Sequence, residues 1–159
     1  MKDGTRFDIT SAADAKSVLD HFNHFHDGFI KRLTLVSQDE IGDDYSQSCN
    51  GIFDVEIEFA HYNYATGAQP LRPPKQRVWA SFFNVQDLFC DLREGYQGNT
   101  INHLAIHLAS RRRGGTTAPE TCLALHLARN YYLEEFRRYE LRQSPLFTFT
   151  HATFWEIVS

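Results

Sequence analysis

Apolar and polar residues alternate with a period of two over several stretches of the chain, which is the pattern of half-buried β-strands. In the clearest stretch, residues 52–61, four large apolar side chains share one face and three carboxylates share the other. Weaker alternation covers residues 29–36, 78–83, 101–109, 122–128 and 147–158. The split into a dry and a wet face predicts an antiparallel sheet with at least one solvated face.

Near the N-terminus the pattern changes to that of a helix. Thr10 or Ser11 can accept the free N–H groups of a first turn, and Asp14 favours the positive end of the helix dipole. An apolar stripe follows at Val18, Leu19 and Phe22. We expect this helix to end near Asn23 or His24, where the helical period is lost.

Polar or proline-rich segments at residues 37–50, 65–75 and 111–119 are predicted to be loops, and residues 84–87 to hold a bulge or a turn. Residues 131–142 fit both a helix and a strand, and their aromatic content favours a strand. The fold class is therefore predicted as α+β: mainly antiparallel β, about six or seven strands in a sandwich or partly open barrel, with one N-terminal helix. We expect residues 1–159 to form a single domain.

Composition agrees with a β-rich, reduced, cytoplasmic protein. The chain has 22 aromatic residues and one Met, and flat aromatic side chains suit pleated surfaces. Three widely spaced cysteines, at positions 49, 90 and 122, form neither a disulfide framework nor a zinc knuckle, so we expect reduced and mostly buried thiols. No secretory or membrane-spanning segment is recognisable, so we expect no membrane association.

The formal net charge of −4 comes entirely from the first half of the chain. Residues 1–79 hold 8 Lys+Arg and 12 Asp+Glu, whereas residues 80–159 hold 8 of each. The only basic run, Arg111–Arg113, is short and precedes two glycines. This distribution argues against nucleic-acid binding.

Histidines form two candidate sites. His24, His26 and Asp27, which follow His21, could ligate a transition metal such as zinc, although a capped helix end and a turn would use the same residues. His103, His107 and His126 would share one face of a hairpin, with His107 and His126 as cross-strand neighbours that could supply a base or a ligand. Decoration of a half-exposed sheet face is the alternative.

The polar face of residues 52–61 is a candidate partner-binding surface. Asp54, Glu56 and Glu58 concentrate negative potential there, and a plain solvated face is the alternative. No catalytic residues are assigned, because the chain has no nucleophile elbow, P-loop, dinucleotide-binding glycine motif, zincin motif or EF-hand loop. The sequence thus favours a non-enzymatic protein without a cofactor.

The segment Phe25–Ile30, which leads from a short helix into a strand, resembles the opening of several small bacterial families. They begin with His-Asp, a small residue and a hydrophobic strand, and some are immunity proteins of polymorphic toxin systems. The resemblance covers about residues 18–60. It implies a protein partner, a toxin that the chain would neutralise by covering its active site. The loops around Gly42 and Pro70, with the acidic strand face, would form the contact surface.

We therefore expect a non-enzymatic interaction domain of bacterial type, with an immunity-like role. The first alternative is a metal-dependent enzyme or metal-binding protein that uses His24, His26 and Asp27. The second is a β-barrel that holds a small apolar ligand among its aromatic residues. The sequence leaves the oligomeric state open.

Overall fold

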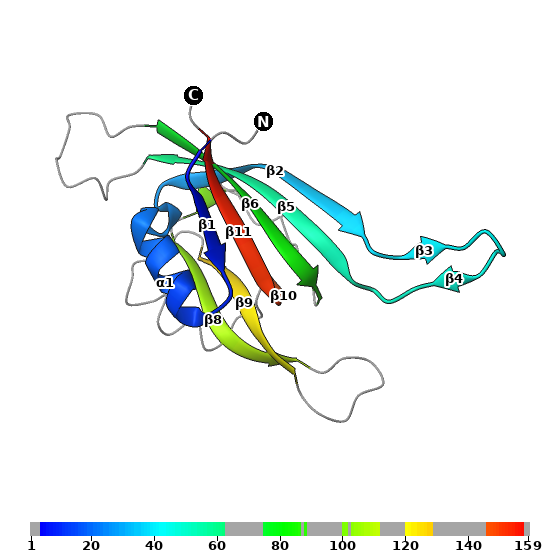
Figure 1. Ribbon diagram of the computed structural model, residues 1–159. Helices are drawn as coiled ribbons and strands as arrows, with labels where there is room; N and C mark the ends of the chain where they lie inside the picture. The colour runs from blue at the N-terminus through cyan, green and yellow to red at the C-terminus, as the bar shows by residue number, and fades with distance from the viewer. Residues whose placement is uncertain are drawn as a thin grey trace.

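The structure is a computed structural model that describes residues 4–62, 75–86, 88, 100–101, 103–111, 120–128 and 146–157. It is mostly antiparallel β with one α-helix, as the sequence pattern predicted (Figure 1). The strands that the structure describes do not close into a barrel. Among the described residues no helix is long and apolar enough to cross a membrane.

The described strands form three sheets, and all their pairings are antiparallel. The six-stranded sheet has the spatial order β1 (Arg6–Ile9), β11 (His151–Ile157), β6 (Lys75–Val85), β5 (Phe53–Tyr62), β2 (Gly28–Ser37), β7 (Thr100–Ile101). The three-stranded sheet has the order β10 (Phe147–Phe149), β9 (Glu120–Ala128), β8 (His103–Arg111). A separate hairpin pairs β3 (Glu40–Ile41) with β4 (Gln47–Ser48).

The two larger sheets meet where the chain passes from one to the other. β10 leads into β11 at Thr150, whose backbone N–H donates to the Phe83 carbonyl at 3.0 Å. Beside this corner Gln86, just after β6, exchanges two backbone hydrogen bonds of 2.9 Å with Thr148. The small sheet is thereby folded over one face of the large sheet, which is called the inner face below.

Helix α1 (Ala12–His21) contacts β1 and β8. Ser11 caps it by accepting from the Asp14 backbone N–H at 3.1 Å, and the Asp14 carboxylate accepts in return from the Thr10 backbone N–H at 3.1 Å. These hydrogen bonds, the Thr10 backbone bond first, lower the pKa of the Asp14 carboxyl. Of the two cap residues that the sequence allowed, Thr10 and Ser11, the structure uses Ser11.

The core lies between the two sheets and the helix and is dominated by phenylalanine. Its largest fully buried side chains come from the turn after α1 and from both sheets: Phe22, Phe25, Phe59, Phe82, Phe147, Phe149 and Phe154. The Phe82 ring lies 5.0 Å from the rings of both Phe147 and Phe149, so it bridges the large and small sheets. Aromatic rings that interdigitate in this way fix how the two layers pack.

The structure corrects four details of the sequence interpretation. The final strand is interrupted at Thr150, and residues 37–50, predicted as a loop, contain the β3–β4 hairpin. Cys49, expected with the buried thiols, is exposed, whereas Cys122 is buried. The short strand β1 was not anticipated. The ambiguous segment 131–142 and Cys90 lie outside the described residues.

Candidate functional site

A two-stranded arm, residues 38–52, projects from the body of the protein between β2 and β5 (Figure 1). Its turn is closed by the Gly42 N–H, which donates to the Ser46 carbonyl at 2.9 Å, and by the Asp44 carboxylate, which accepts from the Ser46 N–H at 3.0 Å. Tyr45 at the tip is 90% exposed and Ile41 is 76% exposed. Both side chains leave apolar surface on the arm open to contact.

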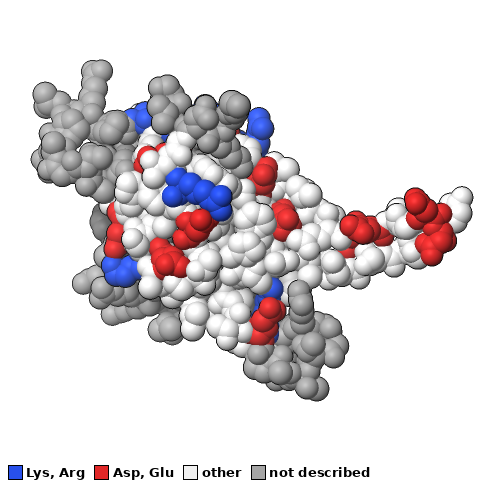
Figure 2. All heavy atoms as spheres, viewed as in Figure 1, with Lys and Arg blue, Asp and Glu red and all other residues white. Residues whose placement is uncertain are grey.

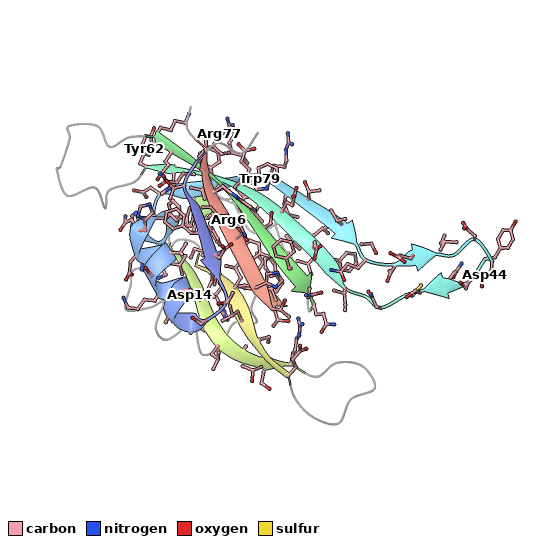
Figure 3. The ribbon with its side chains drawn as sticks, viewed as in Figure 1. Arg6, Asp14, Asp44, Tyr62, Arg77 and Trp79 are labelled. Carbon is pink, nitrogen blue, oxygen red and sulfur yellow. The ribbon has the colours of Figure 1, made fainter. Side chains whose placement is uncertain are left out.

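The acidic arm also carries a charge equal to the whole net charge of the protein. It contains Asp39, Glu40, Asp43 and Asp44 without any Lys or Arg, and the rest of the chain has 16 residues of each sign. Hydrogen bonds within the arm lower the pKa of the Asp39 and Asp44 carboxyls, so both remain ionised at neutral pH. The visible side of the arm is accordingly red, without blue, in Figure 2, and Figure 3 labels Asp44 near its tip.

The base of the arm is fixed to the large sheet by Asp54, the first residue of the predicted acidic row. Its carboxylate accepts from the Gln38 side chain at 2.8 Å and from the Asn84 backbone N–H at 3.1 Å. Asn84 has a φ of 53°, and the β5–β6 register shifts beside it, which places a bulge in the segment where the sequence predicted a bulge or a turn. Asp54 therefore holds the base of the arm against the β5–β6 bulge.

The other two members of the acidic row lie on the outer face of the large sheet, with Thr34 beside Glu56 and Arg32 beside Glu58. Glu58 is only 5% exposed, and its Oε1 accepts from Arg77 Nε at 2.8 Å and Nη2 at 2.6 Å. Glu56 is half-buried. The row shares a face, as predicted, but Arg77 neutralises Glu58, whereas the four carboxylates of the arm equal the net charge of the chain.

The chain turns between α1 and β2 in an unusual backbone conformation. Asn23, His24 and Phe25 have φ of 48°, 50° and 56°, and Asp27 has φ of 57°. Left-handed residues other than glycine are costly, and three in succession persist only where the surroundings hold them. Phe25 supplies that hold, because its ring is fully buried and lies 4.6 Å from the Phe59 ring.

Gly28 ends this left-handed turn where two backbone segments approach closely. A Cβ at position 28 would lie 2.6 Å from the Phe25 carbonyl oxygen and 3.0 Å from His61 Cβ. Gly28→Ala is therefore expected to lower the free energy of unfolding by roughly 1–3 kcal/mol in urea denaturation. Gly42→Ala, whose nearest obstacles are the side-chain oxygens of Ser46 and Asp44, is the control and should cost less. Equal losses would contradict the close packing at Gly28.

The left-handed turn separates the three residues of the predicted metal site. His24 Nδ1 lies 3.2 Å from the Leu104 carbonyl oxygen, and its Nε2 lies 3.2 Å from Asp20 Oδ1. His26 instead lies beside Asp27, with 3.2 Å between Nδ1 and Oδ2, and both are half-exposed. The described residues contain no group of three or more ligands that could hold a metal ion. Metal binding remains a prediction.

Two of the three residues in the second histidine set lie close together. His107 and His126 lie diagonally across the β8–β9 pair, with ring centroids 5.5 Å apart. The His103 ring stacks on His24 at 4.2 Å. Burial, followed by the nearby charges of His24, His26 and His107, lowers the pKa of His103 to about 4. A ring that stays neutral at pH 7 suits a packing role.

Sequence reasoning did not single out His61, the most buried histidine among the described residues. Its ring lies 4.8 Å from the Phe25 ring and 6.1 Å from the Phe22 ring, and burial lowers its pKa to about 4. The alternation of residues 53–59 continues to position 61, so the pattern itself would have placed this side chain inside.

Glu156 connects two polar side chains near His61. Its Oε1 accepts from the Gln76 side chain at 2.8 Å and lies 2.8 Å from His21 Nε2.

Comparisons with known proteins do not relate these sites to any known protein. No family model, no curated protein and no solved structure matches the chain.

Proposed function

We propose that the protein is a non-enzymatic binding domain that engages a basic surface of a protein partner through the acidic arm. The observation that carries this proposal is the coincidence of net charge and exposed apolar side chains on one projecting element. Long-range attraction between opposite potentials speeds encounter, and it does not require a deep pocket.

Tyr45 is the residue best suited to anchor the contact. It is a large amphipathic side chain with little contact to its own protein, and tyrosines are enriched among residues that dominate binding energy. Asp43 and Asp44 directly precede it in the sequence and would meet basic side chains beside the anchor. Under the immunity-like interpretation, the arm would cover a basic active site of a toxin.

The tip variant Asp43→Asn/Asp44→Asn/Tyr45→Ala is expected to weaken partner binding at least about thirtyfold, because loss of one anchoring tyrosine alone costs roughly 2 kcal/mol or more. The partner is first retained by the wild-type protein from cells that express it naturally, at low salt, and identified by mass spectrometry. The purified partner is then titrated calorimetrically with the wild-type protein and the tip variant.

The control variant Asp8→Asn/Asp20→Asn/Tyr62→Ala removes two exposed carboxylates and one exposed tyrosine away from the arm, and it should bind as the wild-type does. Higher salt should weaken wild-type binding. Equal affinity of the tip variant and the wild type, or a partner without a basic surface, would refute the proposal.

A further inference from the structure

Among the described strands, β7 alone pairs with the outer edge of β2, and it does so at one end. The pairs are Gly28 with Ile101 and Phe29 with Thr100, and none of the described strands pairs with this edge from Arg32 onward. The same edge continues into the arm, because β4 lies on the side of β3 that faces β5. An open edge of this length presents a row of backbone N–H and C=O groups that can pair with another strand.

The hydrogen bonds between β2 and β5 show which residues of β2 direct their backbone N–H and C=O groups away from β5. The Gln38 N–H donates at 3.0 Å to the Ile52 carbonyl, which lies toward β5, and the β2–β5 register is regular from Arg32 to Ser37. Backbone groups alternate in direction along a strand. Leu33, Leu35 and Ser37 therefore direct their N–H and C=O groups toward the open side.

Two apolar side chains in the middle of this edge are poorly covered. Leu35 is 44% exposed and Val36 is 50% exposed, although both belong to a paired strand. An exposed edge strand with apolar residues is a site of strand addition in other proteins unless charges or prolines block it. Residues 33–37 contain neither.

Charges at the two ends of the edge are complementary to each other. Arg32 lies four residues before Val36, and both pair with residues of the acidic row on the outer face. Glu40 lies four residues after Val36. The N–H groups of Gln38 and Gly42 both donate to the same side, toward residues 52 and 46, so the alternation continues and places Glu40 on the outer face too. If a second β2 strand runs antiparallel about a two-fold axis at Val36, each Arg32 lies directly opposite the Glu40 of the other copy. Opposite charges directly across strands stabilise a pair, and like charges destabilise it.

We propose that β2 pairs with β2 of a second copy of this chain about a two-fold axis at Val36, which joins the two large sheets into one. The two Val36 residues then form a close, non-hydrogen-bonded pair, and each Leu35 exchanges backbone hydrogen bonds with the Ser37 of the other copy. A two-fold axis at Leu35 is less favourable. It would place Lys31, at the β2 bulge, opposite Asp39, which already accepts from the Asn50 N–H at 2.7 Å.

The expected state in solution is a dimer, with a molar mass near twice 18.4 kDa in sedimentation and light-scattering experiments at about 50 μM chain and low salt. Arg32→Glu and Glu40→Arg should each raise the dimer dissociation constant at least about tenfold, because each creates two like-charge contacts across the axis. A wild-type protein that stays monomeric would overturn the proposal.

Mixing the two single variants provides the decisive test. In the mixed dimer both contacts are again between opposite charges, so an equimolar mixture should dimerise with a dissociation constant within about threefold of the wild-type value. The double variant Arg32→Glu/Glu40→Arg should behave in the same way. Absence of dimer in the mixture, when circular dichroism shows both variants folded, would overturn the proposed pairing.

Arg6→Glu is the matched control, since Arg6 is an exposed arginine on β1 at the opposite edge of the same sheet. It should leave the dimer unchanged. Dimers that persist in both single variants, or that are lost in Arg6→Glu as well, would exclude this edge as the interface. The test does not involve Tyr45 or its neighbouring carboxylates, so its outcome is separate from that of the proposed partner binding.

Discussion

Phe82→Ala is expected to lower the free energy of unfolding by roughly 3–5 kcal/mol. The Phe82 side chain is completely buried and touches three other phenylalanines, at 5.0 Å (Phe147 and Phe149) and 5.6 Å (Phe154) between ring centroids. Its removal leaves a cavity where the two sheets meet. Because domains of this size are stabilised by only about 5–15 kcal/mol, the variant should approach the limit of folding in urea denaturation.

Phe83→Ala is the matched control, one residue further along β6 and on the outer face. Its ring is half-buried and stacks on His151 with 4.5 Å between centroids. The expected loss is below about 2 kcal/mol, because less apolar surface is removed from contact. Similar losses for Phe82→Ala and Phe83→Ala would contradict a core formed between the inner face and the small sheet.

The strands and their faces were predictable because the information is local. Val55, Ile57 and Phe59 face inward as the period of two required, and all three are fully buried. The cap of α1 was equally predictable, because the hydrogen bond between Ser11 and Asp14 involves only residues of the first turn. Local signals of this kind survive folding unless tertiary contacts oppose them.

Tertiary contacts explain where the prediction was wrong. The alternation of residues 147–158 continues through position 150, yet the inward phase changes there, from Phe149 before the corner to Ala152 and Phe154 after it. The cause is distant in sequence: Thr150 is held by the Phe83 carbonyl at 3.0 Å and by the Asn84 side chain at 3.0 Å. No pattern within the segment itself contains that information.

The acidic character of the candidate surface was predictable from the sequence, but the residues that form it were harder to predict. The excess of acid in the first half indicated an acidic contact surface, and the prediction combined the row of residues 54, 56 and 58 with the loops around Gly42 and Pro70. The Asp54 carboxylate accepts hydrogen bonds from Gln38 and Asn84, and the Glu58 carboxylate accepts from Arg77, 19 residues away in sequence. Residues 37–50 were predicted to be a loop because they are polar and acidic and contain Gly42. In the structure β2 and β5 continue into the arm as a two-stranded ribbon.

Burial of His61 links the stability of the fold to pH. Desolvation lowers its pKa from 6.5 to about 4, and it outweighs the opposite effects of Gln76 and Glu156. Above pH 6.5 the imidazole is neutral in both the folded and the unfolded state, so it adds no pH dependence. Between pH 6.5 and 4 the unfolded chain takes up a proton that the folded protein does not, so stability falls as the pH falls.

His61→Leu is therefore expected to remove up to about 3 kcal/mol of the stability loss between pH 7 and pH 4, at about 1.4 kcal/mol per pKa unit. Leucine has a similar volume and no group to protonate beside Phe22 and Phe25. Urea denaturation at half-unit pH steps gives the slope for each variant. His151→Leu, which removes an exposed imidazole on the outer face, should keep the wild-type slope. If His61→Leu keeps that slope too, another group governs the acid sensitivity and His61 is not held neutral by the core.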